Sequence, residues 1–335
     1  MPKAISRAAG QGVPPARELS RTFAEEIASD ASIDGIRFVF DQLAGLLNRR
    51  LPGVGAFHER VAIDAAGRSV PVDIIVPAGS GPFPVLVYYH GGAWVAGNPA
   101  SHRKLTFRFA ERGFVVVSVD YRLAPEHPFP AGFEDCCEAL RWTARNVHRY
   151  GGDPARLAVG GDSAGGNLAA AVAIDFARQR REPRVVAAVL IYGVFDFAEV
   201  GGPLFSRALR DAYLGRNAAE DLLRDPRVSP IHGAAHLPPS LVVVGSQDPL
   251  LADSEALSAR LTAQGVRHEL VVASGMPHGY VQMEFFGNAR RSIASIVAFL
   301  ERELAPSRRR RLSSFVMRFK ALVRDLGNVL RRRMP

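Results

Sequence analysis

One serine in this chain lies in a sequence typical of an activated nucleophile. Residues 161–165 read GDSAG, which matches G-x-S-x-G, and they stand between an apolar run and a helical pattern. A sharp turn from a strand into a helix exposes the serine hydroxyl, and small residues such as Gly161 and Gly165 are needed where the chain passes close to itself. The helix N-terminus also favours developing negative charge. The motif therefore predicts nucleophilic chemistry at Ser163, with Asp162 supporting the turn.

A serine hydroxyl needs a general base, and that base needs a carboxylate to orient it. The best-placed histidine is His278, soon after the apolar run at 270–272, and the best-placed carboxylate is Asp248, soon after the run at 241–244. Both are expected at the carboxyl ends of strands, where open α/β sheets carry their chemistry. The order serine, aspartate, histidine is the one that this architecture uses. Asp253 is predicted to cap the following helix.

A third segment is suited to supplying hydrogen-bond donors to a reacting carbonyl. His90 is followed by Gly91 and Gly92, directly after the apolar run at 85–89. Two adjacent glycines let backbone N–H groups turn toward an oxyanion. We expect the N–H groups of Gly91 and Gly92, together with that of Ala164, to form an oxyanion hole, with His90 supporting the loop.

The rest of the chain indicates which elements position these segments. Apolar, β-branched runs predict strands at 70–76, 85–89, 115–119, 157–160, 186–192, 241–244 and 270–272. Helical patterns are found at 17–50, 101–112, 131–149, 165–180, 252–264 and 289–303. Near-continuous apolar runs are typical of strands covered on both faces. The alternation predicts an α/β fold with a mostly parallel central sheet flanked by helices.

Together these motifs resemble the hormone-sensitive-lipase-like family of α/β-hydrolases, the bacterial family IV esterases. The likeness covers about residues 17–305. It rests on HGGAW at 90–94, DYRLAPEHPFPA at 120–131, GDSAGGN at 161–167, DPL at 248–250 and HGY at 278–280. The resemblance implies an α/β-hydrolase fold and the hydrolysis of short- to medium-chain carboxylic esters through an acyl-enzyme. It implies neither a metal ion nor an organic cofactor.

The resemblance also implies a helical cap over the catalytic domain. Here the cap is expected from residues 1–50 and from an insertion at about 196–238, within a catalytic domain of residues 51–305. A lipase, a lactonase or an amidase that acts on membrane-associated substrate would use the same residues. Gibberellin receptors resemble this family but bind their ligand without hydrolysing it, having lost the catalytic histidine. Because His278 is retained, a purely ligand-binding protein is the less favoured alternative.

The net charge is concentrated at one end of the chain. The formal net charge is +9, and residues 306–335 hold ten Arg or Lys and one acid, so the other residues are balanced. One stripe of this tail is apolar, formed by Leu312, Phe315, Val316, Phe319, Leu322, Val323, Leu326 and Leu330. Such a basic amphipathic helix suits an anionic membrane surface or a protein contact through residues 308–333. Nucleic acid is not favoured, because no folded binding motif accompanies the charge.

Composition narrows the class of protein further. Hydrophobic residues make up 47% of the chain and charged residues 22%, which fits a globular protein and excludes a disordered one. Cys136 and Cys137 are neighbours and the only cysteines, which excludes a disulfide-stapled scaffold. We identify neither a signal peptide nor a run of about 18 apolar residues. We therefore expect a cytoplasmic protein, peripheral on the inner membrane face if the tail binds lipid; assembly into a homo-oligomer stays open.

Overall fold

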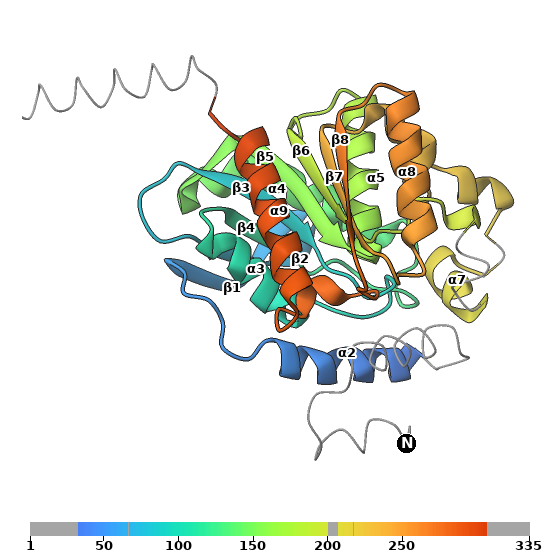
Figure 1. The fold of residues 1–335 in the computed structure, drawn as a ribbon, viewed down its shortest axis with the longest axis horizontal. Coiled ribbons are helices and arrows are strands. Elements are labelled where there is room, and N and C mark those ends of the chain that lie inside the picture. The colour runs from blue at the N-terminus through green and yellow to red at the C-terminus, as the bar shows by residue number, and fades with distance from the viewer. Residues whose placement is uncertain (1–32, 66, 200–206, 217, 307–335) are drawn as a thin grey trace, which may run out of the picture.

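In the described residues, eight strands form one twisted sheet (Figure 1). A computed structural model describes residues 33–65, 67–199, 207–216 and 218–306. The strands are β1 (Ala56–Ala65), β2 (Arg68–Val76), β3 (Phe83–Tyr89), β4 (Val115–Val119), β5 (Gly152–Asp162), β6 (Ala187–Ile191), β7 (Ser240–Gly245) and β8 (His268–Ala273). Their order is β1-β2-β4-β3-β5-β6-β7-β8. The pairs from β4 to β8 are parallel, so the carboxyl ends of these strands meet at one edge.

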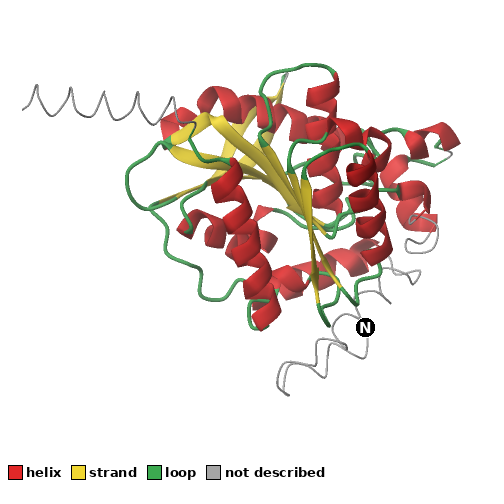
Figure 2. Cartoon of the chain, turned by 45° about the horizontal axis from the view of Figure 1, so that its top comes forward, coloured by secondary structure: helices red, strands yellow, loops and turns green. Residues whose placement is uncertain are grey.

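Helices cover both faces of the sheet (Figure 2). The α-helices are α2 (Ile33–Leu47), α3 (Arg103–Glu111), α4 (Ala131–Asn146), α5 (Ala164–Arg178), α7 (Arg207–Leu214), α8 (Leu251–Ala263) and α9 (Gly287–Glu303). Short 3-10 helices are η2 (Pro99–His102), η3 (Val147–Tyr150), η4 (Glu220–Arg224), η5 (Pro230–His236) and η6 (Tyr280–Gln282). One hydrophobic core joins α4, α5 and α8 to the sheet, and a second joins α3 and α9 to its other face.

Neighbouring residues of a central strand contribute to opposite cores. Val85 and Val87 of β3 lie in the core with α5, whereas Leu86 and Tyr88 lie in the core with α9. Successive side chains of a strand point to opposite faces, and both faces are covered, so nearly every position must be apolar. This explains why the central strands read as continuous apolar runs, and it confirms the predicted α/β class and mostly parallel sheet.

The two edges of the sheet differ from the sequence prediction. The edge strand β1 was not predicted, because its side chains are mainly exposed or half-buried and it carries an irregularity between His58 and Val61. The opposite edge strand β8 was predicted, but the expectation that it is buried on both faces is wrong. Its burial alternates weakly, and Val272 is 43% exposed. Edge strands lack one neighbour, so their sequences are less apolar than those of central strands.

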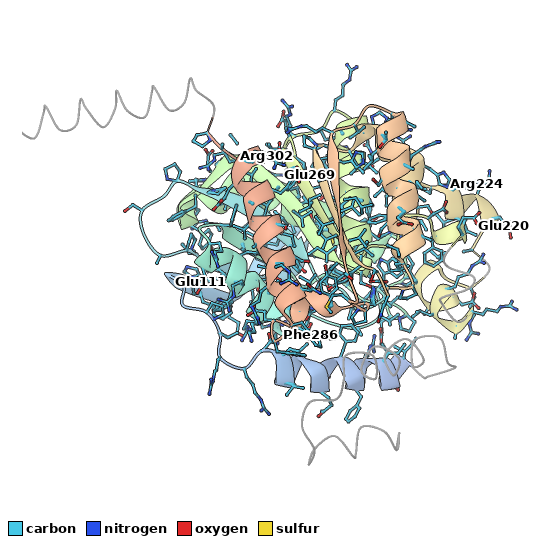
Figure 3. All side chains as sticks on the ribbon, viewed as in Figure 1. Glu111, Glu220, Arg224, Glu269, Phe286 and Arg302 are labelled. Atoms are coloured by element: carbon cyan, nitrogen blue, oxygen red, sulfur yellow. The ribbon has the colours of Figure 1, made fainter. Side chains whose placement is uncertain are left out.

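Helices α2 and α7 lie at the edge where the parallel strands end (Figure 1). Ile36 of α2 and Leu209 of α7 share a small apolar cluster with Ala93 and Val95, which follow β3. At the other end of the molecule, Arg302 near the end of α9 pairs with Glu269 of β8 (Figure 3).

Parts of the predicted cap and the whole predicted basic stripe lie outside the described residues. These parts are residues 1–32, 200–206, 217 and 307–335. Among the helices that are described, none has the length and apolar character needed to cross a bilayer.

Candidate active site

Ser163 occupies a strained turn between β5 and α5. Its backbone angles are φ 55° and ψ −120°, in a region that non-glycine residues rarely adopt. A Cβ atom at Gly165 would lie 1.9 Å from the Tyr89 carbonyl oxygen, and one at Gly161 would lie 2.3 Å from the Gly165 carbonyl oxygen. Only glycine fits at these two positions, because Gly165 lies against the end of β3 and Gly161 lies against Gly165 across the turn.

Three side chains from three strand-end loops form a continuous hydrogen-bonded chain. His278 Nε2 lies 3.0 Å from Ser163 Oγ, and His278 Nδ1 lies 3.0 and 3.1 Å from the two carboxylate oxygens of Asp248. Asp248 is buried and also accepts the backbone N–H of Leu250 at 2.8 Å. The loops follow β5, β7 and β8, as the sequence predicted. The geometry is that of a nucleophile, a base and an orienting acid.

The surroundings of His278 make its imidazole a stronger base than usual. Burial by itself lowers the pKa of His278, but the charge and hydrogen bond of Asp248 outweigh that effect, and the more distant charge of Asp162 acts in the same direction. The pKa is therefore raised above its usual value. A proton taken from Ser163 would consequently be held well, because the imidazolium lies against a carboxylate.

The glycine loop after β3 differs in one respect from the sequence expectation. The N–H of Gly91 donates to Asp162 Oδ1 at 3.1 Å, so it already has a buried acceptor and cannot be counted as a free oxyanion donor. In the described residues, the N–H groups of Gly92, Ala93 and Ala164 have no acceptor. Ala93 was not predicted from sequence, and its position directly after the glycine pair is the signal that could have indicated it.

His90 lies buried against this loop. Its ring stacks on Tyr121 with 4.2 Å between ring centroids, and its Nδ1 atom lies 2.9 Å from the Gly91 carbonyl oxygen. Burial, aided by the charge of His102, lowers the pKa of His90 to about 3. The ring is therefore neutral near pH 7, and it acts by packing.

Asp162 joins three loops around the site. Its carboxylate accepts from the Tyr88 hydroxyl at 2.7 Å and from the Gln282 amide Nε2 at 3.1 Å, in addition to the Gly91 N–H, and it lies 3.1 Å from His102 Nε2. Burial raises the pKa of Asp162, but the charge and hydrogen bond of His102, with the Tyr88 hydroxyl, reverse the shift and leave it lowered. No local motif marks His102 or Gln282, so sequence reasoning missed both.

Asp253 does not have the role predicted for it. Helix α8 begins at Leu251 and has no side-chain cap, and Asp253 lies inside its first turn. Its two carboxylate oxygens accept the backbone N–H groups of Phe195 at 2.5 Å and Asp196 at 3.0 Å. The expectation of a helix cap is therefore wrong, because two N–H groups from another part of the chain satisfy this buried carboxylate.

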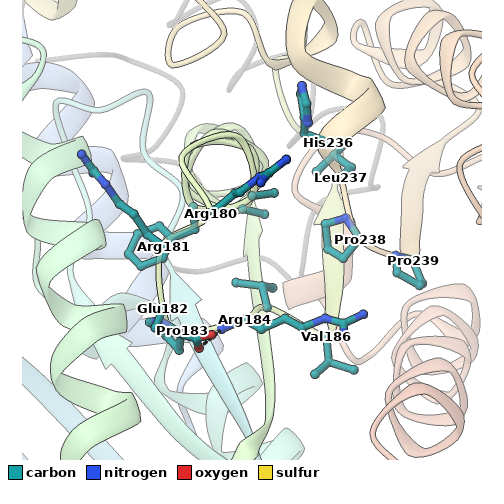
Figure 4. Close-up of a pocket in the computed structure, with 14 residues that line it drawn as sticks. Arg180, Arg181, Glu182, Pro183, Arg184, Val186, His236, Leu237, Pro238 and Pro239 are labelled. Carbon is teal, nitrogen blue, oxygen red and sulfur yellow. Dashed lines mark hydrogen bonds between the residues drawn. The ribbon is translucent and has the colours of Figure 1, made fainter.

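Figure 4 shows a separate hollow whose lining includes none of these side chains. It has a volume of about 510 Å³ and runs between the end of α5 and residues 236–239. Its lining includes Arg180 and Arg184 but none of the predicted site residues. Within the described part of the chain, no group of three His, Cys, Asp or Glu side chains is arranged to hold a metal ion.

Comparison with known proteins agrees with the fold and the site. A family model described as the alpha/beta hydrolase fold matches residues 86–282, which is more than half of the chain. The chain therefore belongs to the α/β-hydrolase family, in agreement with the resemblance to the hormone-sensitive-lipase-like branch.

Individual relatives in this family are esterases. The chain is 39% identical over 213 residues to carboxylesterase NlhH of Mycobacterium tuberculosis, a match that covers 59% of this chain and 66% of the relative. It is 32% identical over 288 residues to ethyl acetate hydrolase of Pseudomonas putida, covering 81% and 90%. A hyperthermophilic esterase from Pyrobaculum calidifontis superposes with a TM-score of 0.77 at 32% identity, covering 88% of this chain and 99% of that one. The match thus spans about two thirds of NlhH and nearly all of the archaeal esterase.

Proposed function

We propose that this protein is a serine carboxylesterase whose catalytic residues are Ser163, His278 and Asp248. The observation that carries the proposal is the unbroken chain of contacts of 3.0 to 3.1 Å from the Ser163 hydroxyl through His278 to Asp248. The strained backbone of Ser163 supports it, because such a turn holds the hydroxyl clear of the sheet. The names of the relatives support the reaction class.

The chemistry follows from the geometry. Ser163 Oγ attacks the ester carbonyl carbon while His278 Nε2 takes the hydroxyl proton, and the carbonyl oxygen becomes an oxyanion. The tetrahedral intermediate collapses, the C–O bond to the alcohol breaks, and His278 gives its proton to the departing alkoxide. A water molecule then attacks the acyl carbon while His278 takes its proton; the second tetrahedral intermediate collapses, the bond to Ser163 Oγ breaks, Ser163 takes the proton back from His278, and the carboxylic acid is released. Asp248 holds the ring in place and stabilises its positive charge throughout.

The proposed oxyanion donors are the N–H groups of Gly92, Ala93 and Ala164. All three are without an acceptor in the described residues, unlike Gly91, whose N–H is held by Asp162. Ala164 also begins α5, so its N–H is one of the free donors of a helix N-terminus. Donors already fixed in place stabilise developing charge without reorganisation. His90, Gly161, Asp162 and Gly165 would support the loops that carry them.

We also propose that residues 1–50 and about 196–238 form a cap that selects the ester, over a catalytic domain of residues 51–305. The packing of α2 and α7 on the loop after β3 supports this division. Arg37 of α2 reinforces it, because its guanidinium donates to the Val95 carbonyl at 2.8 Å and pairs with Glu126. A cap so close to the oxyanion loop favours short- to medium-chain esters as substrates.

For the basic tail we propose peripheral attachment to an anionic membrane surface, on the inner face. Each basic residue near an anionic leaflet contributes about 1 kcal/mol. Full-length protein should sediment with vesicles containing anionic lipid and not with neutral vesicles, whereas a chain ending at Ala305 should sediment with neither. Equal binding of both chains would contradict this role, and capture of a protein partner without any vesicle binding would replace it.

The catalytic proposal is tested with p-nitrophenyl esters from acetate to palmitate, comparing wild type with Ser163→Ala. We expect turnover that is greatest for short to medium acyl chains and lost in the variant. A maximum at long chains would indicate a lipase instead. Turnover of none of the esters by folded wild-type protein would contradict the proposal, and lactones and amides would then be tested in the same way.

A further inference from the structure

The segment through which the chain enters the cap insertion is held by several distant elements. We call residues 194–197 the cap root; they begin three residues after the last residue of β6. Their backbone groups bond to α5, η5 and the residue before η5: the Asn167 amide donates to the Val194 carbonyl at 2.8 Å, Ile231 N–H to the Phe195 carbonyl at 3.0 Å, and Phe197 N–H to Ser229 Oγ at 2.8 Å. The cap root is thus a junction between the nucleophile helix and the cap.

Asp253 supplies a further anchor of the cap root. Its carboxylate accepts the two adjacent N–H groups of Phe195 and Asp196, and its side chain is buried, with the residue only 6% exposed. Asp253 lies five residues after Asp248, the proposed catalytic acid. One short stretch of chain therefore holds both the proposed triad carboxylate and the cap root.

The cap root contacts aromatic side chains beside the oxyanion loop, so a change in its position would affect theirs. The ring of Phe197 lies 5.7 Å from that of Trp94 and 6.0 Å from that of Tyr213, between ring centroids. Trp94 in turn stacks on Tyr213 of α7 at 4.1 Å. The three rings are buried, with Trp94 3%, Phe197 2% and Tyr213 5% exposed, and Trp94 directly follows the proposed donor Ala93. A shift of the cap root would therefore be transmitted through packed rings to α7 of the cap and to the oxyanion loop.

We infer that Asp253 is a positioning residue that sets the cap against the oxyanion loop and thereby controls how well longer acyl chains bind. This inference rests on the proposed esterase function. Without the carboxylate, at least one buried N–H group of the cap root loses its acceptor, which is costly enough to move the segment. An acetyl group needs little space beyond the oxyanion loop, whereas we expect an octanoyl chain to extend toward the cap, so a displaced cap should weaken its binding more.

The same carboxylate changes its charge near neutral pH. Burial, with a smaller contribution from the nearby Asp196 carboxylate, raises the pKa of Asp253 to about 7 against the opposing effect of the Phe195 and Asp196 N–H groups. A protonated carboxyl has one good acceptor oxygen in place of two. Wild-type protein below pH 7 should therefore behave increasingly like an Asp253→Asn variant, whose amide also accepts through one oxygen.

The test compares KM for p-nitrophenyl octanoate with KM for the acetate, from pH 6 to pH 8.5. At pH 8.5 we expect the ratio of the two KM values in Asp253→Asn to exceed that of wild type about fivefold, with kcat on acetate within about twofold. The wild-type ratio should rise on acidification toward that of the variant, whose own ratio stays constant. Taking a ratio removes effects of His278, which act equally on both esters.

Asp73→Asn is the matched control. Asp73 is also buried, at 3% exposed, and its carboxylate accepts the backbone N–H of Arg60 and a side-chain N–H of Arg103, but it contacts no residue of the cap root. The Asp73→Asn variant should be less stable than wild type and should have the same ratio of the two KM values. An unchanged ratio in folded Asp253→Asn, or an equal loss of kcat on both esters, would overturn the inference. If the variant does not fold, a wild-type ratio that is constant with pH would overturn it.

A spectroscopic measurement that does not depend on ester hydrolysis separates this inference from the proposed esterase function. The chain has two tryptophans, and Trp94 is the one in the aromatic cluster. The near-ultraviolet circular dichroism of wild type should change between pH 8.5 and pH 6, and Asp253→Asn should show the low-pH form throughout. If the wild-type protein hydrolyses neither ester, the esterase proposal is contradicted. The dichroism tests the role of Asp253 independently, and the same wild-type spectrum at both pH values would contradict that role.

Discussion

The loops that carry the proposed triad and the segments that form the cap are held by different kinds of contact. Around Ser163 the constraint is the backbone: a strained turn, glycines without space for a Cβ atom, and strand ends fixed by the sheet. The Asp162 side chain adds bonds to this backbone framework. In the cap, side chains make several of the connections across long sequence separations, beside backbone bonds such as that from the Phe129 N–H to the Tyr213 carbonyl at 2.7 Å. Arg37 reaches Glu126 and the Val95 carbonyl, and Asp253 reaches the cap root.

This difference separates chemistry from selection of the ester. Backbone constraints hold reacting atoms closely, because moving them requires distorting a sheet or a glycine turn. Side-chain bridges can be changed one at a time, so the cap can be altered without loss of the triad. We therefore expect substitutions in the loops to lower kcat and substitutions in the cap to change mainly KM.

The largest effect is expected for Asp248→Asn. The amide cannot stabilise the imidazolium, and kcat should fall by about 10³- to 10⁴-fold. Because the charge of Asp248 raises the pKa of His278, the fall of kcat/KM at acidic pH should lie above pH 6.5 in wild type and move to lower pH in the variant. The measurement is a pH–rate profile of both proteins. A profile that does not move would contradict the assignment of Asp248.

A smaller but still large effect is expected for Gly92→Ala. The backbone of Gly92 has φ +132°, and a Cβ atom would lie 2.0 Å from the Ala96 carbonyl oxygen, so the donor loop must shift. Loss of a fixed oxyanion donor costs about 10²- to 10³-fold in kcat. Gly79→Ala is the control, since Gly79 has φ +102° but open space around it. Comparable losses of kcat in both variants would show that backbone strain alone is responsible.

The smallest effect is expected for Arg37→Ala in the cap. The pair with Glu126 is largely exposed, and such pairs contribute about 0–1 kcal/mol, so the melting temperature should fall by a few degrees at most. Loss of the bonds to the Val95 and Ala124 carbonyls should raise KM by about threefold and leave kcat unchanged. Steady-state kinetics with one short and one medium ester measures both. A fall in kcat without a change in KM would contradict the separation of roles.

Much of the sheet could be predicted from sequence, because its central strands are buried on both faces and read as apolar runs. The triad candidates were predictable for the same reason: each follows such a run, and their order along the chain matches the architecture. The edge strand β1 escaped prediction because one neighbour is missing and its side chains meet solvent.

What the sequence did not indicate depends on contacts between distant segments. Gly91 was expected to donate to an oxyanion, but Asp162, 71 residues away, accepts its N–H. Asp253 was expected to cap a helix, but Phe195, 58 residues away, lies within reach of its carboxylate. Neither partner can be inferred from local spacing, because both require knowing which strand ends lie side by side. His102 and Gln282 escaped notice for the same reason.

The most direct test of the central proposal is covalent labelling of the serine by diethyl p-nitrophenyl phosphate. A nucleophilic hydroxyl activated by His278 should displace p-nitrophenolate and carry one diethylphosphoryl group. Peptide mass spectrometry should find this group on Ser163, with activity lost in proportion to labelling and Ser163→Ala left unlabelled. Inactivation with the label on another residue, or ester hydrolysis that survives in Ser163→Ala, would contradict the account.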